Sequence, residues 1–253
     1  MKKIIWSLFD SETAITQELN SEKYIVYSIG LPSSSAITNN FISMDLSKKS
    51  CLKKLEKLPK PDIIFASPPC ETWITVNIGN VRFYKRNYNE HNLYWQKNFK
   101  PNNYASHHRE LRLSGQRTAY FTFKIIEKFN PCLWCIENGS TSLIFKYLYN
   151  YHGLKGFKNL TYYDNYNSKD FSQKPTYIFS NKKLSLNKNK NKNKNNPNRI
   201  AMNTNLSEKL KKEIIASGFL ALKKTYAERS AVPIELYSHI LEINSGMHQQ
   251  TLF

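Results

Sequence analysis

Two short segments of the chain carry side chains that could act together in a reaction. The first is SPPC at residues 67–70, where a cysteine follows two prolines directly after the apolar run DIIFA at 62–66. A thiolate is a strong nucleophile, and a proline pair leaves the following residue little conformational freedom. The second is Glu137-Asn138, which follows another apolar run. A carboxyl group can exchange a proton beside such a nucleophile, so Cys70 and Glu137 predict covalent catalysis.

The elements that must position these residues form a strand–helix rhythm. Apolar runs predict strands at 3–9, 24–31, 41–46, 62–66 and 133–136, and helical spacing predicts helices at 14–21, 51–58 and 114–129. This alternation is typical of an α/β fold with a doubly wound parallel sheet. Ligands of such sheets bind beyond the carboxyl ends of the strands. We therefore expect SPPC and Glu137-Asn138 to lie at neighbouring strand ends.

The remaining segments break this rhythm. Residues 75–113 mix basic, polar and aromatic residues and predict a long loop or insertion. Further expectations are a helix capped by Ser140, a hairpin of strands 159–163 and 176–180, a flexible polar run at 187–196, a helix at 206–217, and a helix started by Pro233 within 227–243. The domains predicted are a catalytic domain at 1–181, a small target-recognition or flexible basic region at 182–224, and a returning C-terminal helix at 225–253.

The charge of the chain indicates a polyanionic partner. Its 253 residues contain 37 Lys and Arg against 19 Asp and Glu, a formal net charge of +18. This excess favours nucleic acid, and the basic and aromatic residues of 75–113 suit phosphates and stacked bases. Neither a membrane span nor a signal peptide is apparent, so we expect a cytoplasmic protein. We expect Cys132 and Cys135 to be packed in the core rather than to bind a metal.

The ordered set of motifs resembles the DNA cytosine-5 methyltransferases, especially their short phage-like or restriction-associated members. PPC at 68–70 is similar to the nucleophile motif of that family, and IEN at 136–138 to its ENV or ENP motif. KPT at 174–176 and RSAVP at 229–233 are similar to later family segments. WSLF at 6–9 resembles the opening strand, whose Phe packs on the cofactor adenine. The resemblance implies a Rossmann-like S-adenosylmethionine-dependent methyltransferase fold with a small, irregular target-recognition region.

The resemblance also implies a mechanism. A cytosine is flipped out of double-stranded DNA, the Cys70 thiolate attacks C6, Glu137 contacts N3 and the exocyclic amine, and methyl is transferred to C5 from S-adenosylmethionine. Asn138 would orient the strand end. The cofactor-binding residues implied are Phe9, Asp10, Ser11, Thr13, Asp45, Ser67 and Pro68. The DNA-binding residues expected are Arg82, Lys85 and Arg86 of the basic insertion, together with Lys174, Thr176 and Arg229 of the later family-like segments. The biological setting implied is DNA modification, either as protection of host DNA from a restriction enzyme or as a phage or orphan methylase. The partners implied are double-stranded DNA and a separately encoded restriction enzyme or partner subunit.

Two positions depart from the family pattern. The turn after the first strand, Asp10-Ser11-Glu12-Thr13, contains no glycine where the family has a glycine-rich turn. Gly30 stands at the end of the second strand, where the family has an acid for the ribose hydroxyls. Glu12 or another acid could take over that role.

Other interpretations stay open. Cys70 could be a packed structural cysteine, and Glu137 a surface carboxylate. SPP at 67–69 also resembles the motif of amino-directed DNA methyltransferases, which modify adenine N6 or cytosine N4 without a thiol, and Trp73 could supply the aromatic residue missing at position 70. A non-catalytic DNA-binding homologue, or a subunit of a modification complex, is a third interpretation.

Overall fold

The computed structural model describes residues 1–10, 15–32, 41–70, 72–73, 103–168, 171, 174–188, 212 and 231–246. Three predicted segments lie mostly outside these ranges. They are the insertion at 75–113, the polar run at 187–196 and the helix at 206–217. Within the described part, no helix is long and apolar enough to cross a membrane.

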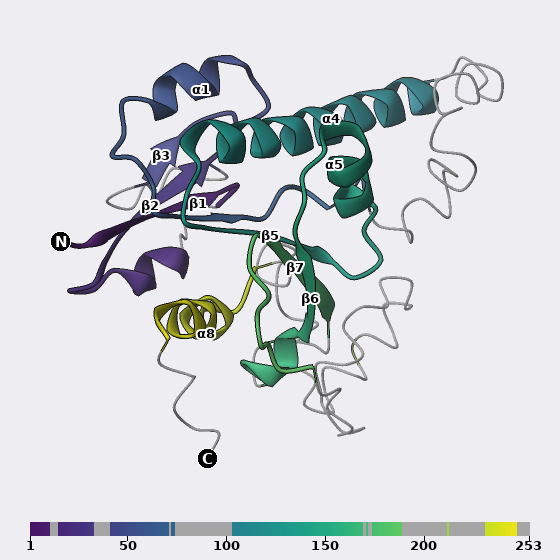
Figure 1. Cartoon of the computed structure of the whole chain (residues 1–253). Helices are drawn as coiled ribbons and strands as arrows, with labels where there is room; N and C mark the ends of the chain where they lie inside the picture. The colour runs from purple at the N-terminus through teal and green to yellow at the C-terminus, as the bar shows by residue number, and fades with distance from the viewer. Residues whose placement is uncertain are drawn as a thin grey trace. The chain divides into compact units, whose positions relative to one another are not determined.

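The described strands form one seven-stranded sheet (Figure 1). They are β1 (Lys3–Leu8), β2 (Tyr24–Gly30), β3 (Phe41–Ser43), β4 (Ile63–Ala66), β5 (Leu133–Gly139), β6 (Phe157–Tyr162) and β7 (Pro175–Ser180), in the order β3-β2-β1-β4-β5-β7-β6. The pairs β1–β2, β2–β3, β1–β4 and β4–β5 are parallel. The chain winds outward from β1 to β3 and then returns to place β4 on the other side of β1. The predicted Rossmann-like α/β fold is therefore confirmed, with its topological switch point between β1 and β4.

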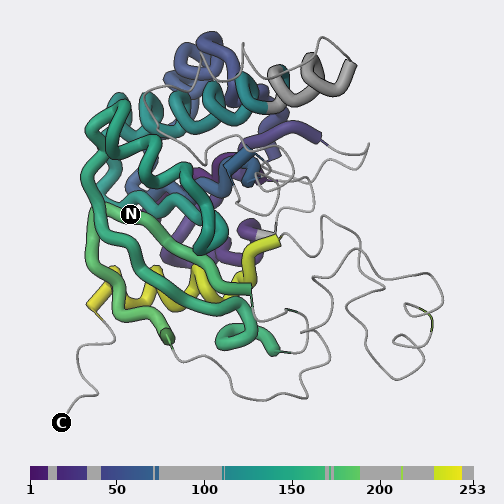
Figure 2. Tube along the Cα trace, turned by 90° about the vertical axis from the view of Figure 1, so that its right-hand side faces the viewer, coloured from purple at the N-terminus to yellow at the C-terminus, as the bar shows by residue number. Residues whose placement is uncertain are grey.

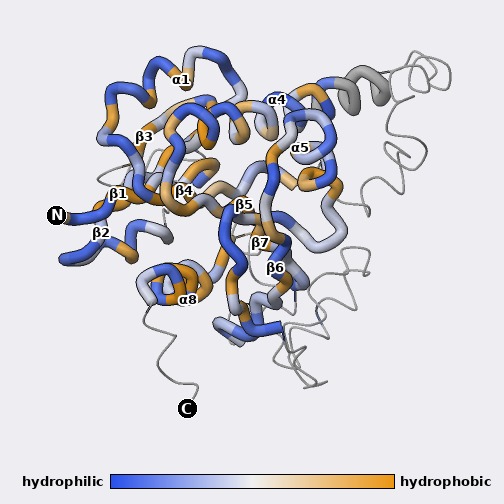
Figure 3. The backbone as a smooth tube through the Cα atoms, in the orientation of Figure 1, coloured by the Kyte–Doolittle hydropathy of each residue, from blue (hydrophilic) through white to orange (hydrophobic). Residues whose placement is uncertain are grey.

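The strands form because their residues are apolar on both faces, as a parallel sheet covered by helices requires. Ile5, Trp6, Ile63, Ile64 and Phe65 are completely buried. Figure 3 shows hydrophobic residues along β1 and β4, whereas hydrophilic residues dominate α1 (Ser50–Leu55). Burial of this apolar surface is the main driving force for the sheet.

Helices cover the sheet. The first unit contains α1, the 3-10 helix η1 (Ile15–Leu19), α4 (Asn103–Phe129) and α5 (Ile144–His152). Figures 1 and 2 show α1 and α4 side by side over one face of the sheet. Lys128 of α4 pairs with Glu56, the C-cap residue of α1. The sheet-facing side of α4 is fixed in part by Phe129, whose ring meets Trp6 edge-on with centroids 4.6 Å apart.

Two helix boundaries differ from the sequence expectation. α4 begins at Asn103 rather than Ser114. Its first turns carry Ala, Glu, Arg and Leu without glycine or proline, and propagating an existing helix is far easier than nucleating one. α5 begins at Ile144, and Ser140 does not cap it; the Ser142 hydroxyl instead accepts a hydrogen bond from the Ile144 N–H at 3.3 Å. Ser140 is displaced because β5 continues to Gly139.

The described chain divides into two compact units. The first comprises Met1–Phe157 and Phe179–Asn181, and the second Lys158–Ile178 and Lys182–Phe253. In the second, Tyr163–Asn165 forms the 3-10 helix η2, and α8 (Ile234–Ser245) follows Pro233 as predicted. The predicted hairpin is also confirmed, since β6 and β7 are sheet neighbours.

Side-chain hydrogen bonds tie α8 into the second unit. The Tyr166 hydroxyl lies 3.2 Å from His239 Nδ1, and Lys182 Nζ donates to Asn244 Oδ1 at 2.7 Å. These contacts give the C-terminal helix fixed neighbours within its own unit.

An aromatic cluster between α4 and α5 surrounds His152. The His152 ring stacks on Phe123 with centroids 5.3 Å apart and an interplanar angle of 21°, and it also contacts Tyr120 and Tyr147. Partial burial, and then the positive charge of Lys124, lower the pKa of His152 below its ordinary value. The folded protein therefore favours the neutral ring.

This shift predicts a pH dependence of stability. Below the unfolded pKa of about 6.5, the unfolded chain binds a proton more readily than the folded one, so the free energy of unfolding should fall as the pH is lowered. Between pH 7.5 and pH 5.5, the free energy of unfolding measured with urea should fall less for His152→Phe, which keeps the ring packing, than for the native protein. Equal losses in both proteins would contradict this assignment.

Candidate active site

The two motifs singled out in the sequence lie at adjacent strand ends. β4 and β5 pair in parallel with Ala66 opposite Ile136, so the residues that follow each strand leave the sheet side by side. The Asn138 side chain links the two segments, because its Nδ2 donates a hydrogen bond to the Pro68 carbonyl at 2.9 Å. Both partners of this bond are buried. The SPPC segment is thus fixed directly to the strand that carries Glu137.

A turn after SPPC fixes Cys70 from its other side. The Trp73 N–H donates to the Cys70 carbonyl at 2.8 Å, and the Trp73 carbonyl accepts from the Leu143 N–H at 3.0 Å. Trp73 is fully buried, with its ring 4.9 Å from that of Tyr147 of α5. Trp73 is therefore a core residue. Cys70 itself is half-buried, between the packed turn and the surface.

α4 also packs against this turn through a glycine. A Cβ atom at Gly115 would lie 2.4 Å from the Thr72 hydroxyl oxygen and 2.6 Å from Thr72 Cβ. Only a residue without a side chain permits this approach of the helix to Thr72. The close packing compensates for the lower helix propensity of glycine. The signal in the sequence is a lone glycine inside a helical pattern. Sequence reasoning missed Gly115 as a residue that packs against the turn after SPPC.

Gly115→Ala should therefore displace the turn. We expect a loss of about 1–3 kcal/mol in the free energy of unfolding, typical of overpacking. We also expect a changed rate of Cys70 alkylation by iodoacetamide, followed by peptide mass spectrometry. Ser114→Ala, at the exposed neighbouring position, is the matched control and should change neither quantity. An unchanged alkylation rate in Gly115→Ala would show that α4 does not position Cys70.

The acidic partner and the amide beside it are both buried. Glu137 is 6 % exposed and Asn138 is 1 % exposed, and they form part of β5 rather than the loop beyond it. The buried position of Glu137 is not that of a surface carboxylate. Burial places the Glu137 carboxyl group in a medium of low dielectric constant, where its electrostatic interactions are strengthened.

The other cysteines occupy different environments. Burial, and then the negative charge of Asp45, raise the pKa of Cys51 to about 11, so its reactive thiolate is rare near neutral pH. Cys135 is buried within β5. Cys132 is exposed, contrary to the expectation of packing, because it precedes β5, and its Sγ donates to the Asp62 carbonyl at 2.9 Å. Cys132 therefore lies at the amino end of β5, whereas Cys70 follows the carboxyl end of β4.

The carboxyl ends of β1 and β2 form the neighbouring part of this edge. The Ser67 N–H donates to the Leu8 carbonyl at 3.2 Å, which links SPPC to the end of β1. Phe9 then has a φ of 62°, an unusual value for a bulky residue. The next residue, Asp10, donates its N–H to the Ile29 carbonyl at 3.2 Å. Ser11 and Thr13 lie outside the described residues.

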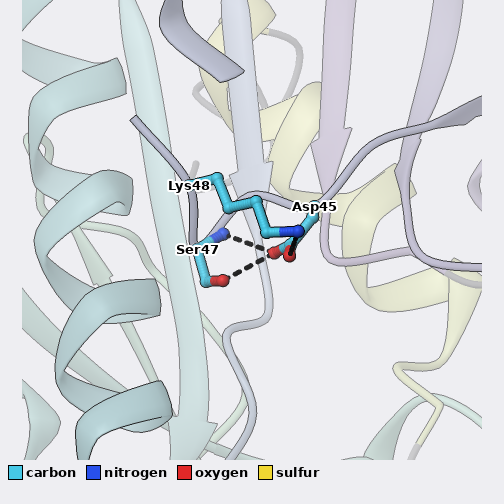
Figure 4. A network of polar contacts seen from close by, with 3 residues as sticks. All are labelled: Asp45, Ser47 and Lys48. Atoms are coloured by element: carbon cyan, nitrogen blue, oxygen red, sulfur yellow. Dashed lines mark hydrogen bonds and ion pairs between the residues drawn. The ribbon is translucent and has the colours of Figure 1, made fainter. Parts of the chain in front are cut away.

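Asp45 is engaged in the turn that follows β3 (Figure 4). Its Oδ1 accepts hydrogen bonds from the Ser47 N–H at 2.9 Å and the Ser47 hydroxyl at 2.6 Å, and Oδ2 lies 3.3 Å from Lys48 Nζ. Partial burial alone would raise the pKa of Asp45, but the bonds from Ser47 and the Lys48 charge lower it. These contacts stabilise the turn at residues 45–48, which leads into α1.

The predicted DNA contacts are described only in part. Lys174 places its ammonium group 4.6 Å from the centre of the Tyr163 ring, and Thr176 is fully buried. Both belong to the second unit. The remaining predicted contacts lie outside the described residues; they are Arg82, Lys85, Arg86 and Arg229.

Comparison with known proteins yields structural likenesses only. No family model matches the sequence, and no curated protein matches it. Among solved structures, the fold is similar to a DNA modification methyltransferase encoded within an Escherichia coli prophage, with a TM-score of 0.38 and 13 % identity over 71 % of this chain and 46 % of that one.

Two further likenesses are to the methyltransferase EhMeth of Entamoeba histolytica and the Dnmt2 methyltransferase of S. pombe. Their TM-scores are 0.44 and 0.39, with 12 % and 10 % identity, and they cover 75 % and 72 % of this chain. The match spans about half the length of each solved structure: 57 % and 51 % for these two. At this similarity, the functional proposal depends on the residues of the chain itself.

Proposed function

We propose that the protein is a DNA methyltransferase that modifies C5 of cytosine in double-stranded DNA through a covalent bond to Cys70. The observation that carries this proposal is the hydrogen bond from Asn138 Nδ2 to the Pro68 carbonyl. It fixes the only described cysteine that follows the carboxyl end of a strand to the strand bearing Glu137. The net charge of +18 supports a polyanionic substrate such as DNA.

The roles of the residues follow from their chemistry. The Cys70 thiolate forms a bond to C6 of an extruded cytosine, and the C5–C6 π electrons move into the ring, making C5 nucleophilic. Glu137 contacts N3 and the exocyclic amine and stabilises the charge that develops there. S-adenosylmethionine, when bound, would supply the methyl group for C5 and be released as S-adenosylhomocysteine. Loss of the C5 proton to a base then returns electrons to the ring and expels Cys70 as a thiolate.

Asn138 acts through position rather than by reaction. Its amide holds the Pro68 carbonyl, so the proline pair and the following thiol keep a fixed relation to Glu137. Pre-organisation of this kind lowers the entropy lost in reaching the reactive geometry. Without this bond, the buried Pro68 carbonyl would need another donor.

The burial of Trp73 favours the thiol route over the amino-directed one. An amino-directed enzyme needs an aromatic face that stacks on the flipped base, and Trp73 was the candidate for that role. Trp73 is fully buried and packs on Tyr147. Cys70, by contrast, is half-buried.

Trapping with 5-fluorocytosine tests the proposal. Fluorine at C5 cannot leave as a proton does, so a duplex containing 5-fluorocytosine and the methyl donor should give a covalent protein–DNA adduct. Intact mass spectrometry should detect the adduct, and peptide mapping should assign it to Cys70. Genomic DNA of mixed sequence, isolated from cells grown with the fluorinated base, covers the range of target sites. Recovery of free protein alone would contradict the covalent mechanism.

A further inference from the structure

The glycine-free turn after β1 begins at Asp10, and Asp10 lies against Gly30 at the end of β2. Gly30 is the other position that departs from the family pattern. A Cβ atom at Gly30 would stand 2.1 Å from the Asp10 carbonyl oxygen and 3.1 Å from its carbonyl carbon. Both contacts are with main chain, which cannot rotate away as a side-chain end can. An acidic side chain on β2 at this position is therefore sterically excluded.

Asp10 is held beside β2 by a main-chain hydrogen bond and by the conformation of the preceding residue. The Asp10 N–H donates to the Ile29 carbonyl at 3.2 Å, so Asp10 follows the edge of β2. The positive φ of Phe9 directs the chain into this path. Strained main-chain conformations of bulky residues persist where the surrounding structure enforces them, and they gather at functional sites.

The Asp10 carboxylate is fixed beside the end of β2. The Thr16 hydroxyl of η1 donates to the Asp10 carboxylate, and the same hydroxyl lies 3.2 Å from Ser28 Oγ of β2. Ser28 precedes Gly30 by two residues and is completely buried. The chain thus places a carboxylate near the end of β2 without carrying the acid on β2.

We propose that Asp10 is the residue that accepts hydrogen bonds from the ribose hydroxyls of the adenosine-containing methyl donor, and that Gly30 makes room for it. In doubly wound sheets an acid near the end of the second strand binds the ribose hydroxyls of a nucleotide. A carboxylate can accept several hydrogen bonds at once, and one of those at Asp10 comes from the Thr16 hydroxyl. The inference rests on the proposed function, because that function supplies the nucleoside cofactor.

Calorimetric titration with S-adenosylhomocysteine and with its 2′-deoxyribose analogue tests the inference. The native protein should bind the analogue about tenfold more weakly, as expected for a lost hydrogen bond to a charged group. Asp10→Ala should bind S-adenosylhomocysteine at least about tenfold more weakly and should no longer distinguish it from the analogue. Asp10→Asn preserves the shape of the turn and should also bind more weakly. Glu18→Gln, at an exposed acid of η1, is the matched control and should bind like the native protein.

The outcomes separate the two proposals. If the native protein binds S-adenosylhomocysteine and folded Asp10→Ala or Asp10→Asn binds both ligands as the native protein does, the role of Asp10 is overturned and the proposed function stands. If the native protein binds neither ligand, the cofactor of the proposed function is itself wrong. Thermal unfolding of each variant establishes that it is folded before the titration.

Discussion

DNA incubated with Cys70→Ala and S-adenosylmethionine should carry no methylated cytosine above background. Removing the thiol deletes the bond to C6, and without this bond C5 is too weak a nucleophile to accept methyl. For a nucleophile that acts covalently, the expected loss of rate is on the order of 10⁴-fold or more. Tritium transfer from labelled cofactor to DNA measures it. Affinity for DNA should be nearly unchanged, because a half-buried thiol adds little to binding of a polyanion.

Cys132→Ala is the matched control for this experiment. Cys132 is exposed and precedes β5, at the amino end of that strand. Its replacement removes one thiol and should leave methyl transfer as it is in the native protein. If Cys70→Ala retained methyl transfer, the serine and main chain of SPP at 67–69 would have to perform amino-directed methylation instead.

Gly30→Ala should destabilise the first unit strongly. The added Cβ would lie 2.1 Å from the Asp10 carbonyl oxygen, far inside van der Waals contact. Asp10 and Gly30 lie at the ends of neighbouring strands, and the atom that the Cβ would meet belongs to the main chain. Relief requires Asp10 to move away from β2. We expect a loss of about 3 kcal/mol in the free energy of unfolding, together with weaker binding of S-adenosylhomocysteine. Urea unfolding and calorimetric titration measure the two effects.

Ser43→Ala serves as the control for Gly30→Ala. Ser43 is the register partner of Gly30 on β3, and it is exposed. The substitution adds no atoms and should change stability by no more than about 0.5 kcal/mol, as is usual for surface positions. Native stability and native ligand affinity in Gly30→Ala would mean that Asp10 is not held against β2 in solution.

The sheet and the meeting of the two motifs could be predicted from the sequence. Apolar runs separated by helical spacing indicate parallel strands, and strand ends of such a sheet lie along one edge. That reasoning placed residues 67–70 and Glu137 near each other, and the register of β4 with β5 bears this out.

Contacts that depend on exact geometry could not be predicted. The bond from Asn138 to Pro68 requires the register of two strands about 70 residues apart, which no local pattern encodes. The first turns of α4 are polar, so they lack the apolar period that reveals a helix. The need for glycine at Gly30 arises from main chain that lies elsewhere in the sequence.

Nucleoside analysis of methylated DNA tests the central claim most directly. Unmethylated DNA is incubated with the native protein and S-adenosylmethionine labelled in its methyl group, digested to nucleosides, and separated by liquid chromatography with mass detection. The account predicts labelled 5-methylcytosine, absent when Cys70→Ala replaces the native protein. Label in N4-methylcytosine or N6-methyladenine, retained by Cys70→Ala, would contradict it.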